Sequence, residues 1–237
     1  MVTIQKIGKL FILFLIVAGL ASCNDDDEVA PFQVIGEAVI VKRVINQETQ
    51  YARYFYAYGN QPMTSAEVDL PEGGTITLSE DQTERSYYDM PEIEDFTDTV
   101  PPIGQFEFTV VNQGIEHFDT ETLEFNDLAI PVIDSVSYSN QKIYVGWEIP
   151  TTDKPDSYLV RLVDDEHNIV FSGVLLNNTA DVYYIEASSN GWIEAPEQKA
   201  YNVELWAYKY EDGISGNDVH FNVNDLSIAS TQVIWGD

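Results

Sequence analysis

Apolar side chains recur at every second position along most of the chain after residue 30. The segments that show this period are, in chain order, 51–58, 106–110, 143–149, 158–162 and 201–207. Because successive side chains of a strand point to opposite faces, this alternation predicts strands with one face buried. No segment after residue 30 keeps a helical period over three turns. The sequence therefore predicts an all-β fold.

Turn-forming residues separate these segments at short intervals. The clearest clusters are 59–60, 71–74, 112–114, 139–140 and 189–191. Short strands at such regular spacing are typical of antiparallel β-sandwiches. Pro131 falls near the middle of this region, and each side has the length of one immunoglobulin-like domain. We therefore predict two tandem antiparallel β-sandwiches, the first over residues 31–129 and the second over residues 130–237.

The second half has several residues where a fibronectin type III domain uses them. Trp147 lies in one alternating segment, 157–162 forms the next, and Tyr201 begins the segment 201–208. On these residues the half resembles a fibronectin type III domain. The resemblance implies Trp147 in strand B, 157–162 as strand C and Tyr201 in the tyrosine-corner position of strand F. The long stretch 211–226 departs from the pattern and leaves the pairing of the last strand open.

The start of the chain has the features of an exported, lipid-anchored protein. Lys6 and Lys9 precede an apolar segment, 10–20, which at eleven residues is shorter than the roughly 20 needed to cross a bilayer. The only cysteine, Cys23, follows small residues, and 20–23 resembles the lipobox of bacterial lipoproteins. The resemblance implies that the signal peptide, residues 1–22, is removed and that a lipid on the Cys23 sulfur anchors the chain. The alternative is an ordinary signal peptide that leaves a free thiol.

An acidic tether, residues 23–30, follows the predicted cleavage site. Its acidic run, Asn24 to Glu28, is either a solvated spacer or an export signal. It resembles the signal that sends lipoproteins of Bacteroidota to the outer face of the outer membrane. Segments 65–74 and 102–110 resemble the amino-terminal, immunoglobulin-like sandwich of many such lipoproteins, which implies an architecture and no activity. We expect an outer-membrane protein that faces the cell exterior.

The charge of the chain excludes one class of partner. The formal net charge is −29, and removal of the signal peptide would take away two lysines and no acidic residue, giving −31. A surface this acidic repels phosphates, so we expect no nucleic-acid partner. A single cysteine excludes an intramolecular disulfide, so the fold must be held by its core. The 14 tyrosines, 11 phenylalanines and 4 tryptophans argue against disorder.

Catalytic and metal-binding motifs are not recognisable in the sequence. His117, His167 and His220 have no partner at metal-ligand spacing and are predicted to be surface residues. The acidic segments 90–98 and 217–225 could gather a calcium ion, but neither contains a calcium-loop motif. We therefore predict no enzyme activity, no catalytic residue, no cofactor and no metal site. A hydrolase that uses paired carboxylates is the less favoured alternative.

Aromatic residues are the best candidates for a ligand-binding site. If Tyr201 faces the core, the alternation places Trp206 and Tyr208 on the outer face of the same strand, and Tyr210 extends this row if the strand runs that far without a bulge. Trp192 lies in a glycine-containing loop. Exposed flat rings stack on sugars and on protein partners at low entropic cost. The alternative is that Trp206 packs against the first domain or a long loop, while Trp192 plugs the end of the sandwich.

Two hydroxyl groups are candidates for modification. Thr99 and Ser135 stand in Asp-Thr/Ser-Val triplets that resemble the O-glycosylation sites of exported Bacteroidota proteins, and an unmodified hydroxyl is the alternative for each. Together with the anchor and the aromatic residues, these features predict a non-catalytic binding or scaffold lipoprotein. Its expected partner is a glycan or an outer-membrane protein. The alternative function is a structural or accessory subunit of a surface assembly or fimbria.

Overall fold

The computed structural model describes residues 30–81, 83–211 and 222–236. The chain divides into two compact units, Met1–Phe32 and Gln33–Asp237. Cys23 and most of the predicted tether lie outside the described residues. Within the described part, the regular structure consists of sixteen strands and one short 3₁₀ helix, η1 (Ile93–Asp95), so the prediction of an all-β fold is confirmed. That short helix could not cross a membrane, and the described residues contain no other.

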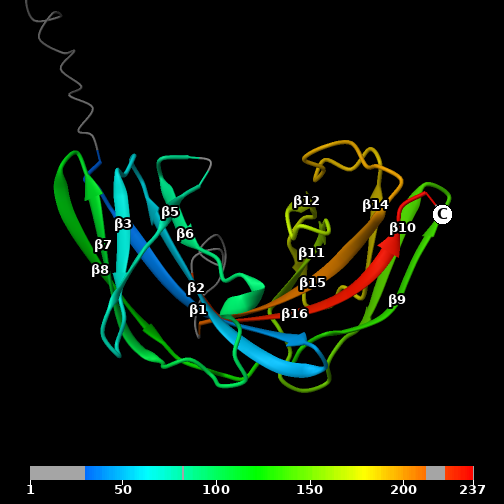
Figure 1. The fold of residues 1–237 in the computed structure, drawn as a ribbon, viewed down its shortest axis with the longest axis horizontal. Helices are drawn as coiled ribbons and strands as arrows, with labels where there is room; N and C mark the ends of the chain where they lie inside the picture. The colour runs from blue at the N-terminus through cyan, green and yellow to red at the C-terminus, as the bar shows by residue number, and fades with distance from the viewer. Residues whose placement is uncertain (1–29, 82, 212–221, 237) are drawn as a thin grey trace, which may run out of the picture. The chain divides into compact units, whose positions relative to one another are not determined.

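Nine strands form one large sheet, which we call the central sheet. They are β1 (Val34–Ile45), β2 (Glu48–Gly59), β5 (Ser79–Glu80), β6 (Ser86–Asp89), β11 (Ser157–Val163), β12 (Ile169–Ser172), β13 (Leu176–Asn177), β15 (Ala200–Tyr210) and β16 (Val223–Ile234). Their order is β12–β11–β15–β16–β1–β2–β6–β5, with β13 paired to β11 beside this row. The long strands β15, β16, β1 and β2 form its middle (Figure 1).

The parallel pairing of β1 with β16 joins the two ends of the chain in this sheet. Val41 lies opposite Leu226, and Arg43 lies opposite Ile228. All the other pairings in the central sheet are antiparallel. β1 belongs to the first predicted domain and β16 to the second, so the central sheet takes strands from both. The division at residue 130 stays a prediction.

A four-stranded sheet packs on the part of the central sheet formed by β1 and β2. Its strands are β3 (Ser65–Asp69), β4 (Thr75–Thr77), β7 (Gly104–Asn112) and β8 (Ile115–Leu123), in the order β4–β3–β7–β8. The ring of Phe55 on β2 lies 5.5 Å from that of Phe106 and 6.5 Å from that of Phe108, measured between centroids. A Cβ added to Gly36 would lie 2.3 Å from the Phe108 ring, so the sheets approach closely there.

A three-stranded sheet packs on the part formed by β11, β15 and β16. Its strands are β9 (Val132–Ser139), β10 (Lys142–Glu148) and β14 (Val182–Glu186), in the order β14–β10–β9. Trp147, which is 2% exposed, packs 5.4 Å from Tyr158 in the core between the sheets. The Tyr201 hydroxyl accepts a hydrogen bond from the Glu197 backbone N–H at 3.0 Å and donates one to its carbonyl at 3.3 Å.

These positions agree with the predicted resemblance of the second half. Its predicted strand B is β10, in one sheet, while its predicted strands C and F are β11 and β15, which pair in the other, as in immunoglobulin-like sandwiches. The Tyr201 hydroxyl makes the contacts of a tyrosine corner. The last strand, left open by the sequence, is β16, which pairs with β15 from Ala200↔Ile234 to Tyr210↔Val223.

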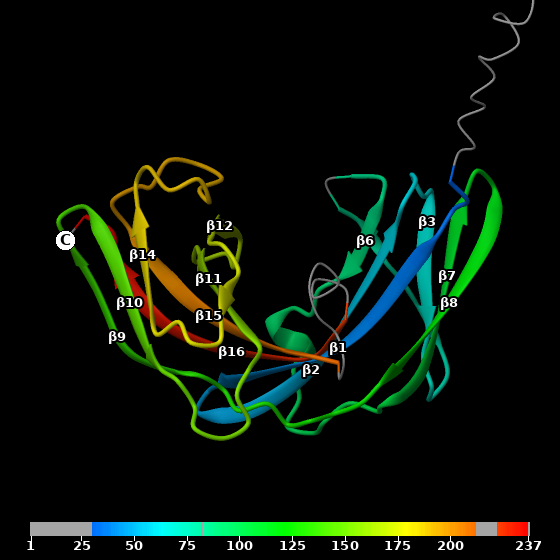
Figure 2. The same ribbon diagram turned by 180° about the vertical axis from the view of Figure 1, so that it is seen from behind.

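Both smaller sheets cover the same face of the central sheet. On β2, Phe55 faces the four-stranded sheet, so its neighbour Tyr54 faces away from it. On β15, Leu205 belongs to the core beneath the three-stranded sheet, while its neighbour Trp206 packs with Val41 on the other side. The face opposite the two small sheets, which we call the groove face, is therefore continuous across both halves (Figures 1 and 2).

Candidate ligand-binding groove

Trp206 lies on the groove face, on the side of β15 that the alternation predicts. Its side chain is nevertheless only 6% exposed, because it packs among Val39, Val41, Leu226 and Ile228 of the paired strands β1 and β16. Of the two arrangements that the sequence left open for Trp206, the structure matches the packed one, since Val39 and Val41 belong to the first predicted domain.

The segment that contains η1 also packs on the groove face. Thr97 forms an antiparallel bridge with Tyr51 on β2, with backbone N–O distances of 2.7 and 3.0 Å. The bridge holds Phe96 against the apolar cluster of Trp206, and Met90 packs against the same cluster. The chain from residue 90 to 97 thus forms a wall over part of the sheet.

Two adjoining cavities lie on the groove face. The arginine cavity has a volume of about 450 Å³, and its polar lining residues include Arg43, Arg161, His167 and Glu204. The tyrosine cavity has a volume of about 330 Å³, and its aromatic lining residues are Tyr54, Tyr56, Trp206, Tyr208 and Tyr210. Met90, Arg161 and Trp206 line both. Each volume falls in the range of roughly 300–1,000 Å³ that is typical of small-molecule sites.

The tyrosines of the second cavity come from strands on both sides of the parallel pair. Tyr54 and Tyr56 lie on β2, opposite Val39 and Glu37 of β1, whereas Tyr208 lies on β15. Burial raises the pKa of Tyr56 and of Tyr208 to about 12, and raises that of Tyr54 further. These hydroxyl groups therefore stay protonated at physiological pH and can donate hydrogen bonds.

Arg161 on β11 forms the shared wall of the two cavities with Trp206. Its guanidinium carbon lies 3.9 Å from the centre of the Trp206 ring, which is a close cation–π contact. The Trp206 indole N–H donates to Glu204 Oε2 at 2.8 Å, and Arg43 Nη2 donates to Glu204 Oε1 at 3.2 Å. The two arginines are thereby tied to one aromatic ring and one carboxylate.

Both guanidinium groups keep an unpaired nitrogen. Among the residues that the structure describes, Nε of Arg43 and Nε of Arg161 are buried and make no hydrogen bond. An unpaired buried donor costs about 1–3 kcal/mol. A ligand with acceptor oxygens would lie beside both guanidinium groups in the arginine cavity, and beside that of Arg161 in the tyrosine cavity.

Of the four aromatic residues predicted to bind a ligand, three line the tyrosine cavity and one does not. Trp206 and Tyr208 line it together with Tyr210, whose hydroxyl lies 2.6 Å from that of Ser157. Tyr210 is 9% exposed, so it contributes little open surface. Ligand binding by these three residues stays a prediction.

Trp192 lies at the end of the second sandwich, away from the groove residues. Its ring centroid is 5.2 Å from those of Phe171 and Trp235 and 6.1 Å from that of Tyr201. Its indole N–H donates to the Glu186 carbonyl at 2.7 Å. Trp192 therefore closes the sandwich core, which is the alternative that the sequence left open.

The other residues singled out in the sequence do not gather at one site. Thr99 and Ser135 are exposed, and their hydroxyls donate to Asp98 Oδ1 at 3.1 Å and to Asp134 Oδ1 at 2.6 Å. Their glycosylation stays a prediction. His167 is exposed in a turn, and His117 is half-buried within β8. His220 lies outside the described residues.

Four groove residues were not predicted from the sequence: Tyr54, Tyr56, Arg43 and Arg161. A signal for the tyrosines was present, because 51–58 carries aromatic residues in both registers of its alternation. A strand with bulky side chains on both faces is one that packs on both faces. No comparable signal marked the arginines, since their positions depend on which strands pair.

Comparisons with known proteins identify no family. No protein-family model matches the chain, and no curated protein matches it in sequence. Among solved structures, the chain is 13% identical to the FN1–FN3 domains of chicken CNTN1, covering 84% of this chain and 62% of that one, with a TM-score of 0.30. It is 13% identical to a two-domain fibronectin type III segment of chicken tenascin, covering 76% and 91%, with a TM-score of 0.27.

Two bacterial enzymes also show similarity. The chain is 14% identical to the Clostridium perfringens spore cortex lytic enzyme SleM, covering 70% of this chain and 35% of the enzyme, with a TM-score of 0.30. It is 10% identical to a β-1,2-glucanase from Parabacteroides distasonis, covering 86% and 36%, with a TM-score of 0.31. The chain thus spans about a third of each enzyme, and similarity at this level carries no argument about activity or partners.

Proposed function

We propose that this chain is a lipid-anchored, non-catalytic binding protein that holds a glycan in the groove face. The observation that carries the proposal is the stacked pair Arg161–Trp206, placed between a cavity with arginines and a cavity with protonated tyrosines. A sugar offers C–H faces that pack on aromatic rings and hydroxyl oxygens that accept from guanidinium groups. Both kinds of partner line the same groove.

The charge around the groove favours a neutral glycan over an anionic one. Glu92, Glu94, Glu166 and Glu204 line the arginine cavity beside its two arginines. The whole chain carries a formal charge of −29. An anionic ligand would meet this repulsion, whereas a neutral one would not.

The proposed location rests on the start of the chain. Cys23 stands at the end of a lipobox-like sequence and before an acidic run, and this arrangement supports a lipid anchor at the outer face of an outer membrane. An accessory subunit of a surface assembly would share the anchor. Such a subunit would not need a cavity large enough to hold a sugar.

Binding of the soluble chain that begins at residue 24 tests the proposal. A glycan array identifies a ligand, and calorimetry then compares variants with the unchanged chain. We expect Arg161→Ala and Tyr208→Ala each to weaken binding at least tenfold. The matched control is Tyr184→Ala, because Tyr184 is 55% exposed on β14 and lines neither cavity.

Thermal unfolding of each variant shows whether weaker binding comes from a lost contact in the groove or from an unfolded chain. Failure to bind any glycan, or equal binding by Arg161→Ala and the unchanged chain, would contradict the glycan assignment.

A reducing-end assay on the bound glycan tests whether the protein is non-catalytic, as proposed. We expect no cleavage, and release of new reducing ends would show a hydrolase instead.

A further inference from the structure

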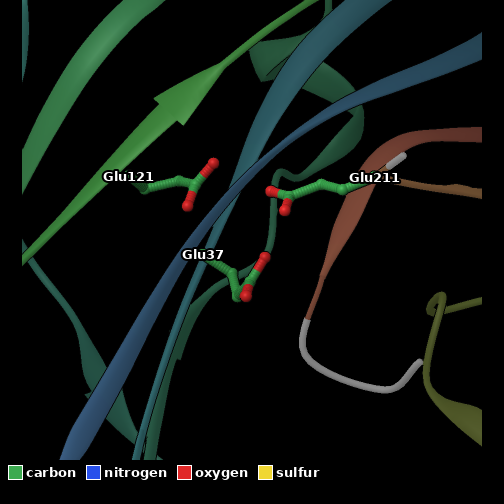
Figure 3. Close-up of side chains that lie close together, drawn as sticks. All are labelled: Glu37, Glu121 and Glu211. Atoms are coloured by element: carbon green, nitrogen blue, oxygen red, sulfur yellow. The ribbon is translucent and has the colours of Figure 1, made fainter. Parts of the chain in front are cut away.

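Three glutamates from distant parts of the chain meet beside the groove. Glu37 lies on β1, Glu121 on β8, and Glu211 directly after β15. One carboxylate oxygen from each lies within 4.8 Å of the other two. Figure 3 shows the three side chains directed toward one another from three different segments. We call them the carboxylate trio.

Glu37 is the unusual member of the trio, because its side chain belongs to the interior. The residue is 5% exposed, and its Oε2 is buried with no hydrogen-bond partner among the described residues. The carboxyl group accepts a hydrogen bond from the Val223 backbone N–H, so only part of its capacity is used. In Figure 3 the carboxyl group of Glu37 lies below those of Glu121 and Glu211, with one of its oxygens on the side of Glu211.

Among the described residues, the charged groups that shift the pKa of Glu37 are carboxylates. Burial, followed by repulsion from Glu121 and Glu211, raises the pKa of Glu37 to about 9, and Asp119 adds to this. Burial and the neighbouring Glu211 also raise the pKa of Glu121. Three carboxylates this close cannot all remain charged without a proton or a cation between them.

A path for an ion leads to the trio from one side. Glu121 and Glu211 line a third cavity, the acidic cavity, of about 400 Å³, together with Thr122, Glu124, Asn126, Lys209, Tyr210 and Asn224. Among the described residues of this lining Lys209 is the one cation, and its ammonium group is paired with Asp156 at 3.1 Å. The other polar groups offer oxygen atoms, and the volume admits water molecules as further ligands.

We propose that Glu37, Glu121 and Glu211 bind one divalent cation, with Ca²⁺ as the preferred ion. Carboxylate oxygens are the ligands that Ca²⁺ takes, at about 2.3–2.6 Å, so two oxygens on one ion can lie up to roughly 5 Å apart. The spacing of the trio meets that limit. Mg²⁺ needs oxygens at about 2.1 Å in strict octahedral geometry, so it requires the trio to contract.

The cation joins three elements that the chain brings together only in the folded state. β1 and β15 belong to the central sheet, and β8 belongs to the four-stranded sheet. Glu37 lines the tyrosine cavity, and Tyr210 lines both that cavity and the acidic one. A bound ion therefore fixes one end of the groove. The site itself does not depend on what the groove binds.

Calorimetry with calcium chloride tests the site on the soluble chain from residue 24, which keeps the whole compact unit 33–237. After treatment with a chelator and desalting, we expect one Ca²⁺ per chain at pH 7.5. Glu121→Gln should weaken binding at least tenfold. Glu116→Gln is the matched control, because Glu116 is an exposed residue of the same strand, and it should bind as the unchanged chain does.

Thermal unfolding gives a second readout that does not depend on heats of binding. Added Ca²⁺ should raise the unfolding midpoint of the unchanged chain and of Glu116→Gln, but not that of Glu121→Gln. Absence of both heat and midpoint shift in the unchanged chain would show that the trio holds protons only, and would overturn the proposal. Equal affinity for Mg²⁺ would overturn the preference for Ca²⁺.

Discussion

Val41 of β1 lies opposite Leu226 of β16 in parallel register, and both side chains are 1% exposed. Through this contact the first strand and the last strand of the fold become neighbours in one sheet. We call this pairing of β1 with β16 the seam. The groove, the stacked Arg161–Trp206 pair and the carboxylate trio all lie along or beside it. The seam is therefore the feature on which the proposed sites depend.

Leu226→Ala should destabilise the fold by about 2–5 kcal/mol, because it leaves a cavity in a fully packed cluster. Urea unfolding measures the change in free energy. Val132→Ala, at a position that is 54% exposed, should change stability by no more than about 0.5 kcal/mol.

Because one sheet runs through both halves, calorimetry should show a single unfolding transition for the unchanged chain. Two separate transitions would contradict the prediction that the two halves unfold together.

The contact of Arg161 with Trp206 should be measurable as a coupling energy. A double-mutant cycle with Arg161→Ala and Trp206→Leu, followed by urea unfolding, isolates the pairwise part from the separate effects of each change. We expect a coupling of about 0.5–2 kcal/mol, as for other cation–π contacts. A coupling near zero would mean that the guanidinium merely fills space above the ring.

Asp225 should make stability depend on pH. Burial raises the pKa of this carboxyl to about 6 from the usual 3.8, although the Asn126 backbone N–H donates to it at 3.2 Å. The folded state therefore holds a proton that the unfolded state has lost, so the Asp225 contribution to stability is present below about pH 4 and is lost as pH rises through 6. The size of this loss is roughly 2–3 kcal/mol.

Asp225→Asn removes this titration while keeping an acceptor for Asn126. Relative to the unchanged chain, the variant should gain roughly 2–3 kcal/mol between pH 4 and pH 7.5 in urea unfolding. Asp134→Asn, an exposed residue on β9, controls for the loss of one negative charge. A difference between Asp225→Asn and the unchanged chain that stays constant with pH would refute the shifted pKa.

Cys23→Ser should release the protein from the membrane, because a serine hydroxyl is not the thiol that carries the lipid. Fractionation of cells and incorporation of labelled fatty acid measure the change. Replacing Asp25, Asp26 and Asp27 with alanine should leave the lipid in place but reduce protease accessibility on intact cells. Firm membrane attachment of Cys23→Ser would exclude the proposed anchor.

Several local features could be read from the sequence. The alternation in 51–58 predicted β2, and that in 201–207 predicted β15 with Trp206 on the face away from Leu205. The turn cluster 112–114 predicted the hairpin between β7 and β8, where Gln113 and Gly114 have φ values of 51° and 78°. Each of these follows from neighbours a few residues apart, whose geometry is set by the backbone itself.

The sequence did not show which distant segments pack on each face of a strand. Trp206 was placed on the correct side of its strand, yet its burial depends on Val39 and Val41, which lie far away in the chain. Glu37, Glu121 and Glu211 carry no motif spacing, so nothing in the sequence marked them as neighbours. Pairing between distant strands is set by the fit of whole surfaces, which no short pattern records.

The sequence by itself determined that this chain forms strands and which side of each strand is apolar, because alternation is a property of the local backbone. Only the tertiary structure decided that β1 and β16 lie side by side, that the outward aromatics become the floor of a groove, and that three glutamates meet. The physical reason is that each of these requires chain segments to approach over long sequence distances, and that approach is decided by packing across the entire fold.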